Sequence, residues 1–309
     1  MRFDVLVIGA GPAGLTAGLY ASRAGWRAAC LERLAPGGQA ALTSRVENYP
    51  GFEEPVSGFE LTRRMEAQAR QFGMEIVRDE AEDLSSGPDG AVVKAAADTF
   101  EARAVVVASG ARPRKLGVPG EEELTGRGVS YCATCDGPFF KGQAVAVVGG
   151  GDSALEEAVF LARLCSRVYV VHRRDEFRAV RVLVDRALSH ENIVPVWGSV
   201  VTRIVGSEGV EAMEVRNVAT GAAQRLDVAG VFMYVGLLPN SEFLAGRVAV
   251  DEAGYVITDE DMLTSAPGVF AAGDVRKKSL RQISTAVGDG AIAGMSAVRH
   301  LQGLETGRK

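Results

Sequence analysis

Cys132 and Cys135 are the residues whose type and spacing most directly suggest chemistry. Two thiols at this spacing can close a small disulfide ring, and neighbouring thiols often have lowered pKa values that keep a thiolate available. The same spacing also occurs in half of a zinc site and in buried structural pairs. The motif alone therefore leaves three interpretations open, and the surrounding sequence has to decide between them.

The other two cysteines, Cys30 and Cys165, lie in apolar stretches, and we expect both to be core residues. A four-thiolate zinc site would require them to converge on Cys132 and Cys135. Neither a second Cys-x-x-Cys motif nor a nearby histidine supports such a site, so we expect no metal. The cysteine pattern is also not that of a disulfide-stapled secreted protein.

Length and composition are those of a globular protein with room for two domains. Its 309 residues, 47% of them hydrophobic, suffice for two domains with sizeable cores. The 34 basic and 39 acidic residues give a net charge of −5, which provides no indication of a nucleic-acid partner. No apolar run approaches the roughly 18 residues of a membrane span, and the N-terminus is typical of a first strand rather than a signal peptide. We therefore expect a cytoplasmic protein without a membrane segment.

A first nucleotide-binding signature opens the chain. An apolar strand over residues 5–8 leads into Gly9-Ala10-Gly11-Pro12-Ala13-Gly14, a helix to about residue 24, and a second strand over residues 28–31 that ends at Glu32. The glycines allow a tight turn, close approach of a pyrophosphate and close helix packing. Glu32 can accept hydrogen bonds from a ribose 2′-hydroxyl, although a solvated loop charge is the alternative.

The second signature is a copy of the first, 140 residues later. A strand over residues 145–148 precedes Gly149-Gly150-Gly151-Asp152-Ser153-Ala154, and the shift places His172 where the first copy has Glu32. Arg173, Arg174 and Arg178 follow, and guanidinium groups bind a 2′-phosphate where a carboxylate would repel it. The second site is therefore predicted to bind NADPH. A solvated basic face is the alternative for the arginines, and a packing role is the alternative for His172.

The two copies also end alike, at Gly110-Ala111-Arg112-Pro113 and at Gly236-Leu237-Leu238-Pro239. We interpret these segments as crossings between domains. The predicted fold is α/β, with two Rossmann-like nucleotide-binding domains of the three-layer β/β/α type and the second inserted into the first. The expected domains are residues 1–113 and 244–309 for the outer one and residues 114–243 for the inserted one.

The chain then returns to the first domain. A strand over residues 266–272 ends at Gly273-Asp274, where the carboxylate could bond a ribityl hydroxyl of a flavin or cap a helix. Arg281-Gln282-Ile283 is expected to begin a helix that runs to about residue 301 and whose start faces the flavin ring. The basic residues 276–278 could be a solvated loop or could favour an acidic partner.

These motifs together resemble the low-molecular-weight, prokaryotic-type thioredoxin reductases over essentially the whole chain. The resemblance rests on both glycine signatures, residues 37–39, 47–51, 132–137, 172–179, 273–274 and 281–282. It implies FAD in the outer domain, NADPH in the inserted domain, a homodimer, and thioredoxin as the protein substrate. It places flavin contacts on Glu32, Gly38, Gln39, Asn48, Asp274 and Gln282, and pyridine-nucleotide contacts on Ser153, Arg173, Arg174 and Arg178. Further cofactor-binding candidates are Arg33, Gly37, Gly110, Asp152, His172, Gly236, Gly273, Arg281 and Ile283.

The resemblance also implies a mechanism. NADPH reduces the flavin, and the flavin reduces the Cys132–Cys135 disulfide, with Cys135 nearer the ring. The inserted domain then rotates, Cys132 attacks the disulfide of thioredoxin, and Asp136 moves the proton. Asp136 could instead be a turn residue before Gly137, and Pro138 departs from the residue expected there.

Four alternatives remain at this point. The cysteine pair argues against a flavin-dependent ferredoxin reductase, and the arginines argue against a relative that does not use NADPH. A non-enzymatic flavin-binding redox sensor does not account for a dithiol beside an NADPH site. A reductase of another small disulfide protein is the serious alternative.

Overall fold

The computed structural model describes residues 1–43, 46–87 and 90–306 and divides into two compact units. Unit 1 comprises Met1–Arg112 and the chain from Leu238 onward, and unit 2 comprises Pro113–Leu237. The crossing segments, β7 (Ala111–Pro113) and β16 (Leu237–Pro239), pair as a two-stranded sheet. The second crossing comes earlier than the expected boundary after residue 243. The reason is that Asn240 is bonded into unit 1, through its N–H to the Gly110 carbonyl (2.9 Å) and its side-chain amide to the Ser109 carbonyl (2.8 Å).

Unit 1 is built on a seven-stranded sheet in the order β3-β2-β1-β6-β5-β4, with β17 also beside β6. Strands β1, β2, β3, β6 and β17 are parallel, whereas β4, β5 and β6 form an antiparallel meander. The strands are β1 (Arg2–Ile8), β2 (Ala28–Glu32), β3 (Glu75–Arg78), β4 (Ala81–Gly87), β5 (Gly90–Ala95), β6 (Thr99–Val107) and β17 (Val269–Ala271). The parallel arrangement brings the carboxyl ends of β1, β2, β6 and β17 to one edge.

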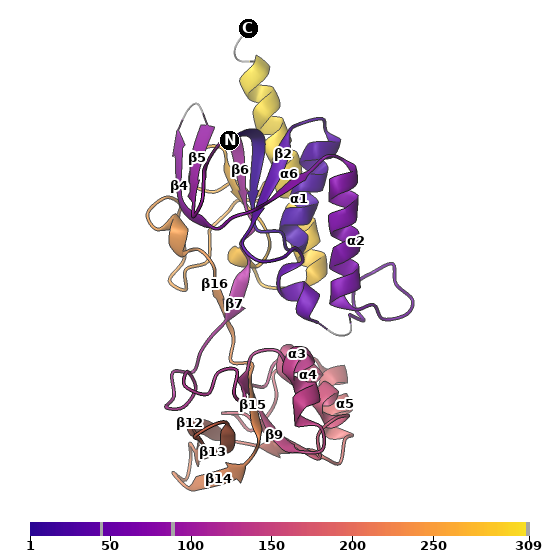
Figure 1. Cartoon of the computed structure of the whole chain (residues 1–309), viewed down its shortest axis with the longest axis vertical. Helices are drawn as coiled ribbons and strands as arrows, with labels where there is room; N and C mark the ends of the chain where they lie inside the picture. Colours follow the sequence, from indigo (N-terminus) through magenta and orange to yellow (C-terminus); the bar gives the residue numbers. More distant parts are fainter. Residues whose placement is uncertain (44–45, 88–89, 307–309) are drawn as a thin grey trace. The chain divides into compact units, whose positions relative to one another are not determined.

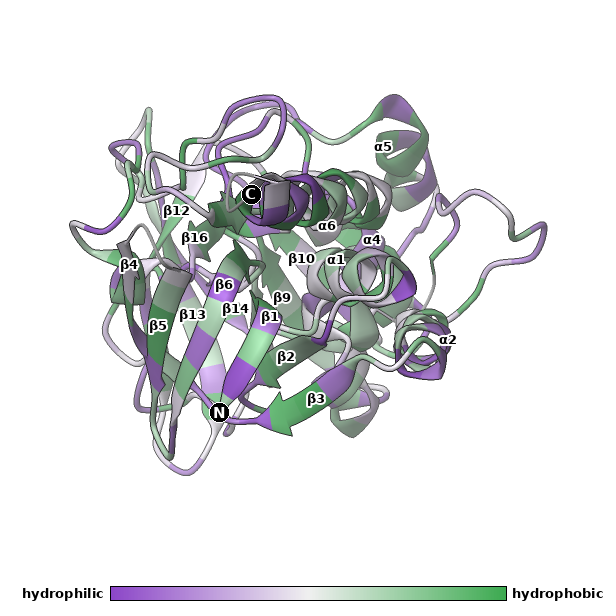
Figure 2. Ribbon diagram, turned by 90° about the horizontal axis from the view of Figure 1, so that it is seen from above, coloured by the Kyte–Doolittle hydropathy of each residue, from purple (hydrophilic) through white to green (hydrophobic). Residues whose placement is uncertain are grey.

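Helices cover one face of this sheet (Figure 1). They are α1 (Pro12–Arg23), α2 (Gly58–Gln71) and α6 (Ile283–Thr306), with short 3₁₀ turns η1 (Gly38–Leu42), η3 (Glu242–Leu244) and η4 (Gly273–Val275). α1 and α6 pack very closely, because a Cβ on Gly290 would lie 2.2 Å from the Ala13 carbonyl oxygen. Figure 2 shows these two helices end-on. The close packing fixes the start of α1 against the C-terminal segment.

Both faces of the central strands are buried, which explains their continuous apolar sequence. Val5 and Val7 belong to the core under the helices, and Leu6 and Ile8 to the core under the meander. Figure 2 shows β2 in the colour of hydrophobic residues. Among the described residues, no helix combines the length and apolar character needed to cross a membrane.

Unit 2 repeats this plan. Its parallel sheet has the order β11-β10-β9-β15-β8, and β12-β13-β14 form a separate antiparallel sheet. The strands are β8 (Val129–Ser130), β9 (Ala144–Val148), β10 (Arg167–Val171), β11 (Ile193–Val196), β12 (Ser199–Gly206), β13 (Val210–Asn217), β14 (Ala223–Asp227) and β15 (Gly230–Met233). The helices are α3 (Ala133–Asp136), η2 (Gly137–Phe140), α4 (Asp152–Ala162) and α5 (Arg181–Leu188).

The predicted α/β class with two Rossmann-like units is confirmed. Each unit has one hydrophobic cluster on either face of its parallel strands; the antiparallel strands belong to the same sheet in unit 1 and form a separate sheet in unit 2. The helix expected from Arg281 begins at Ile283 instead. Gln282 precedes it, and its N–H donates to the Thr285 hydroxyl (3.1 Å).

Candidate active site

The cysteine pair lies where β8 ends and α3 begins, and its two sulfurs are joined in a disulfide. The two Cα atoms are 5.3 Å apart. Cys132 is the N-cap of α3, and its Sγ accepts a hydrogen bond from the Cys135 N–H (3.2 Å). A donor aimed at this sulfur favours its thiolate form after reduction.

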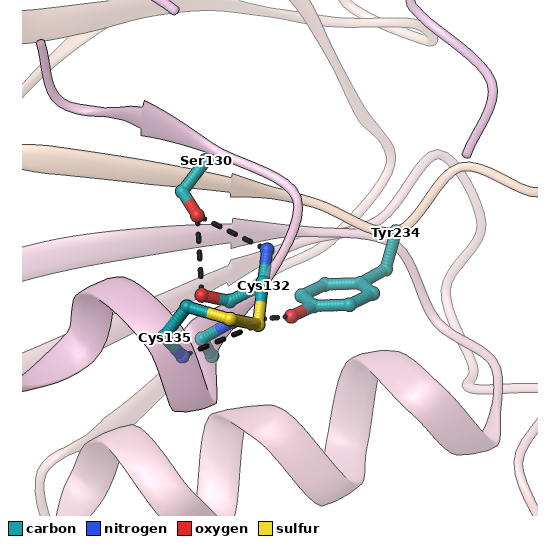
Figure 3. The surroundings of a disulfide bond; sticks show 5 residues. Ser130, Cys132, Cys135 and Tyr234 are labelled. Carbon is teal, nitrogen blue, oxygen red and sulfur yellow. Dashed lines mark hydrogen bonds between the residues drawn. A yellow bond between two sulfur atoms is a disulfide. The ribbon is translucent and has the colours of Figure 1, made fainter. Parts of the chain in front are cut away.

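Two side chains from neighbouring strands hold the disulfide turn (Figure 3). The Ser130 hydroxyl accepts from the Cys132 N–H (3.0 Å) and donates to the Cys132 carbonyl (3.2 Å). The Tyr234 hydroxyl accepts from the Ala133 N–H (2.9 Å). Asp136 closes the turn from the other side, since its N–H donates to the Cys132 carbonyl (3.1 Å).

The disulfide lies at the surface of the chain. Cys135 is exposed and Cys132 is half-buried, while Pro138 and Phe139 beside them are exposed, Phe139 to 77%. A buried structural pair is therefore the wrong interpretation. Cys30 and Cys165 are core residues as predicted, in different units, and burial raises the pKa of Cys165 to about 11. No group of three or more His, Cys, Asp or Glu side chains in the described part of the chain could hold a metal ion.

The first glycine loop joins three segments at the edge of the unit 1 sheet. Gly9 has φ +101°, and a Cβ there would lie 2.4 Å from the Ala108 carbonyl oxygen at the end of β6. Gly14 is equally confined, since a Cβ would meet the Gly9 carbonyl oxygen at 1.8 Å. Gly273, with φ +76°, comes against Ala13. By contrast, a Cβ on Gly11 meets no described atom within 4 Å, so the front of the loop is open.

Glu32 is held in place at the end of β2. Its carboxylate accepts from the Ala10 N–H (2.9 Å) in the glycine loop and from the Leu34 N–H (2.9 Å). This is not the geometry of a freely solvated loop charge. Arg33 points elsewhere, forming an exposed ion pair with Glu80 (3.2 Å).

Segments far apart in the sequence meet around the same loop. Gly37, with φ +113°, donates its N–H to the Ala10 carbonyl (2.8 Å), which leads into Gly38 and an exposed Gln39. The Asn48 amide donates to the Gln282 side-chain oxygen (3.1 Å), across 234 positions of sequence. Ile283 then starts α6.

A flavin dinucleotide fits this set of residues. The N-terminus of α1 has no side-chain cap from the described residues, and Pro12 occupies its first turn, so its free N–H groups face the open front of the loop. Asp274 Oδ1 is buried without a hydrogen-bond partner among the described residues, and burial raises the pKa of this carboxyl. Lys278 forms a long ion pair with the same oxygen (3.7 Å), which leaves its hydrogen-bonding capacity for a ligand hydroxyl.

The second loop has the same shape. A Cβ on Gly149 would lie 2.4 Å from the Tyr234 carbonyl oxygen and 3.0 Å from Ala154, whereas one on Gly151 meets no described atom within 4 Å. The Asp152 carboxylate accepts from the Val180 N–H (2.8 Å), and Ser153 is exposed. A pyrophosphate fits in front of this loop for the same reason as in unit 1.

The residues after β10 separate into a buried histidine and exposed arginines. His172 is 5% exposed and lies against Gly150, where a Cβ would meet its Nδ1 at 2.5 Å. Burial, followed by the charges of Arg178, Arg174 and Arg173, lowers the pKa of His172. Its position supports the packing alternative. The three arginines are exposed, and none of them forms an ion pair with a described residue.

Gly110 and Gly236 stand at equivalent places, one residue before β7 and β16. Their φ angles are +68° and +116°, and a Cβ on either would meet no described atom within 4 Å. The Arg114 N–H donates to the Gly236 carbonyl (2.9 Å). Both glycines therefore make turns that a side chain would strain, at the ends of the crossing segments.

The sequence matches one known protein family over most of its length. The model of the family described as pyridine nucleotide-disulphide oxidoreductase matches residues 3–290. The chain belongs to this family.

The similar relatives and solved structures of this oxidoreductase family described next are named thioredoxin reductase. Proteins named thioredoxin reductase are 48% identical over 305 residues in Listeria innocua, covering 98% of this chain and 95% of the relative, and 47% identical over 304 residues in Bacillus subtilis, covering 98% and 96%. The crystal structure of thioredoxin reductase from Lactococcus lactis matches with a TM-score of 0.95 at 43% identity, covering 97% of this chain and 99% of that one. The predictions of the family, of a disulfide reductase and of FAD and NADPH as cofactors are confirmed at the level of the family.

Ion pairs explain two of the three basic residues at positions 276–278, which the sequence left open as a solvated loop or a site for an acidic partner. Asp289 on α6 binds Arg276 (3.1 Å) and Lys278 (3.0 Å) and accepts from the Gly273 N–H (3.1 Å). Two of the three basic residues thus hold the Gly273 turn from within, and only Lys277 is exposed. Arg281 lies over the Tyr255 ring, 4.0 Å from its centroid, and its Nε is buried without a partner among the described atoms.

Sequence reasoning missed Ser130, Tyr234, Glu157 and Asp289. Tyr234 follows β15, which is parallel to β8 and β9, so the carboxyl ends of these three strands lie at one edge of the sheet. The repeated strand pattern could therefore have indicated that Tyr234 lies near the cysteine pair. Glu157 lies in the middle of α4, where burial, then the charge of Glu156, raises its pKa to about 7. A single carboxylate within a helix gives no such signal in sequence.

Proposed function

We propose that this chain transfers electrons from NADPH, through bound FAD, to the Cys132–Cys135 disulfide and on to thioredoxin. The observation that carries the proposal is an exposed disulfide at a Cys-x-x-Cys turn in the same unit as a glycine loop flanked by unpaired arginines. Full-length relatives named thioredoxin reductase support the choice of substrate.

Unit 1 would hold FAD. The Gly9–Gly14 loop and the N-terminus of α1 would hold the pyrophosphate, and Glu32 would accept a hydrogen bond from the adenosine ribose. Asp274 would accept from the ribityl chain through the oxygen that makes no hydrogen bond to a described residue, and the Asn48–Gln282 pair would lie beside the flavin at the start of α6. The flavin, when bound, supplies the two-electron chemistry that links a pyridine nucleotide to a disulfide.

Unit 2 would hold NADPH at the Gly149–Ala154 loop. Arg173, Arg174 and Arg178 provide guanidinium groups for the 2′-phosphate, which is the group that distinguishes NADPH from NADH. His172 acts through packing: it fills the space over Gly150 and so sets the position from which the arginines extend. Ser153 is exposed at the first turn of α4 and is available to the nucleotide.

The dithiol then reduces the protein substrate by exchange. Two electrons break the sulfur–sulfur bond, and the pair becomes one thiolate and one thiol. Cys132 attacks the substrate disulfide, and Cys135 resolves the mixed disulfide. Cys132 is the less exposed of the two residues in the oxidised turn. Asp136 adjoins Cys135 and would give and then take back the proton.

The remaining parts of the proposal concern assembly. Both the nicotinamide and the disulfide belong to unit 2 but must serve one flavin held by unit 1, so unit 2 would rotate about the paired crossings β7 and β16. We extend the same proposal to a homodimer working in the cytoplasm.

The test of the proposed function is NADPH oxidation by the purified holoenzyme with a panel of oxidised proteins, namely thioredoxin, glutaredoxin and a peroxiredoxin. We expect kcat/KM for thioredoxin to exceed that for the others by about a hundredfold or more, a difference of about 3 kcal/mol in transition-state binding. Comparable values for another small disulfide protein would contradict thioredoxin as the substrate. No NADPH oxidation with any of them would contradict the function itself.

A further inference from the structure

Behind the disulfide turn lies a group of half-buried polar side chains that the proposed mechanism does not use. α3 packs on α4, since a Cβ on Gly137 would meet the side chains of Leu161 (2.9 Å) and Phe160 (3.2 Å). Tyr234 reaches the same turn from the end of β15 and accepts the Ala133 N–H through its hydroxyl. Figure 3 shows its ring pointing at the first turn of α3. The turn is therefore held from inside the unit.

Glu157 and Thr134 face this interior with unsatisfied atoms. Glu157 Oε2 and Thr134 Oγ1 are both buried without a hydrogen-bond partner among the described residues. Burial, and next the charge of Glu157, raises the pKa of Tyr234, and the charge of Asp136 acts in the same direction. Glu157 precedes Phe160 and Leu161 by one turn of α4, so it lies on the face of that helix that packs on the α3 turn.

The Glu157 carboxylate, whose Oε2 has no hydrogen-bond partner among the described residues, should respond to reduction of the disulfide. Reduction of the disulfide creates a thiolate on the turn that Tyr234 holds. Like charges in a poorly solvated region disfavour each other, so the thiolate and the Glu157 carboxylate cannot both form without cost. Their protons then leave in coupled steps that belong to the pair. The charged group that acts on Glu157 is Glu156 on its own helix, and Asp136 on α3 acts, together with Glu157, on Tyr234.

We propose that Tyr234 and Glu157 are positioning residues of the redox site: Tyr234 fixes the first turn of α3 through Ala133, and Glu157 couples its protonation to that of the dithiol. When two electrons break the disulfide, one sulfur takes a proton and the other remains a thiolate. Glu157 takes up a solvent proton as that thiolate forms and releases it when the disulfide closes again. This inference rests on the proposed function only in treating Cys132–Cys135 as the pair that cycles.

The first test measures thiol ionisation in the holoenzyme reduced with dithiothreitol and freed of reductant, so that it does not depend on electron transfer from NADPH. The rate of iodoacetamide alkylation at Cys132 is followed by peptide mass spectrometry from pH 6 to pH 8.5. Glu157→Gln removes the negative charge that forms above about pH 7. The variant should alkylate at the wild-type rate at pH 6 and about three to ten times faster at pH 8, because a like charge raises a thiol pKa by about half a unit to one unit.

The matched control is Glu208→Gln, an exposed glutamate in the turn between β12 and β13 of the same unit. Its alkylation rate should equal that of the wild type throughout. A ratio of Glu157→Gln to wild type that stays constant across the pH range would overturn the coupling. If the variant does not fold, the wild type can be tested by itself through the carboxyl ¹³C chemical shift of Glu157. The midpoint of its pH titration should be about half a unit to one unit higher in the reduced than in the oxidised protein. Equal midpoints would overturn the coupling.

The second test addresses Tyr234 separately. Tyr234→Phe removes the oxygen that accepts the Ala133 N–H, so amide hydrogen exchange in residues 131–137 should become about five to ten times faster, as expected for one lost hydrogen bond. Tyr169→Phe, on β10, should leave that exchange unchanged. Unchanged exchange in Tyr234→Phe would show that the hydroxyl does not position the turn. Failure of the proposed function would instead appear as an NADPH-reduced holoenzyme whose disulfide stays closed, which neither test requires.

Discussion

Unit 1 carries Glu32 at the end of β2, whereas unit 2 carries His172 followed by Arg173 and Arg174 after β10. The glycine loops in front of these residues have matching open and confined positions. The carboxylate of Glu32 is fixed by two backbone N–H groups, while the arginines extend into solvent without ion pairs among the described residues. The same backbone arrangement therefore carries a negative charge in unit 1 and positive charges in unit 2.

The difference shows how a repeated fold acquires two ligands. A carboxylate that is already hydrogen-bonded keeps its acceptor lone pairs aimed at a neutral ribose, and it repels a phosphate. Exposed guanidinium groups lose little when they bind a phosphate, because no partner has to be displaced. Unit 2 adds a further element that unit 1 lacks, namely the redox turn after β8. Substitutions at each of these places should therefore affect different parts of the function.

The largest effect is expected from Cys135→Ser, which removes the redox function of unit 2 and leaves both nucleotide sites intact. Reduction of thioredoxin should fall by about a thousandfold or more, since exchange cannot be completed without the second sulfur. NADPH-dependent reduction of ferricyanide should stay near the wild-type rate. Cys165→Ala, in the core of the same unit, is the control and should keep both activities. Thioredoxin reduction by Cys135→Ser near the normal rate would mean that the dithiol has been assigned wrongly.

Next in size is the double variant Arg173→Ala/Arg174→Ala, measured as kcat/KM for NADPH and for NADH. We expect about a hundredfold loss with NADPH and less than about threefold change with NADH, because only the 2′-phosphate loses its partners. Arg203→Ala, an exposed arginine on β12, should change neither value. An unaltered preference for NADPH would remove the arginines from the site and leave them as a solvated face.

A smaller effect concerns stability. The pKa of Glu157 is raised from 4.5 to about 7, mainly by burial, so the folded state holds a proton that the unfolded state has lost between these pH values. The stability that this carboxyl contributes is therefore fully present below about pH 4.5 and is lost as the pH rises through about 7. Relative to the wild type, Glu157→Gln should gain less than about 1 kcal/mol of unfolding free energy at pH 5 and about 2 kcal/mol at pH 8, below the roughly 3 kcal/mol that the full shift would give.

This stability difference can be followed in unit 2 alone. Trp197 lies in that unit, so urea unfolding would be monitored by its fluorescence in a Trp26→Phe background. Glu208→Gln provides the pH-independent control. A difference between Glu157→Gln and its parent that is the same at pH 5 and pH 8 would contradict a raised pKa for this carboxyl.

The smallest effect is expected in unit 1 from Glu32→Gln. The amide retains one acceptor but loses the charge that the Ala10 and Leu34 N–H groups stabilise, so FAD affinity should fall by about tenfold. The measurement is quenching of flavin fluorescence on titration into apoprotein. Glu82→Gln, exposed on β4, should bind FAD as the wild type does. An unchanged affinity would show that the carboxylate serves the loop and not the ligand.

Much of the fold could be predicted because its signals are local. The apolar runs at residues 5–8 and 145–148 became β1 and β9, and the glycines after them mark turns where a Cβ would collide with backbone. The 140-residue repeat then fixed the plan of unit 2. Cys132 and Cys135 were recognisable because their chemistry depends on spacing within one turn.

The parts that sequence did not give depend on contacts between distant segments. Asn240 pulls the end of the second crossing into unit 1 by bonding to Ser109 and Gly110, and no local pattern reveals that bond. For His172 both ligand contact and packing were open, and its burial against Gly150, which has no side chain, supports packing. Glu157 differs from other helix carboxylates only because the fold removes it from solvent. Burial of this kind is a property of packing.

The central claim is that electrons from NADPH reach the Cys132–Cys135 disulfide. Its most direct test is an anaerobic titration of the oxidised holoenzyme with NADPH, quenched with iodoacetamide and read by peptide mass spectrometry. The account predicts that alkylation appears at Cys132 and Cys135 together, in proportion to the NADPH added, while Cys30 and Cys165 stay unmodified. Bleaching of the flavin with Cys132 and Cys135 still joined would contradict it.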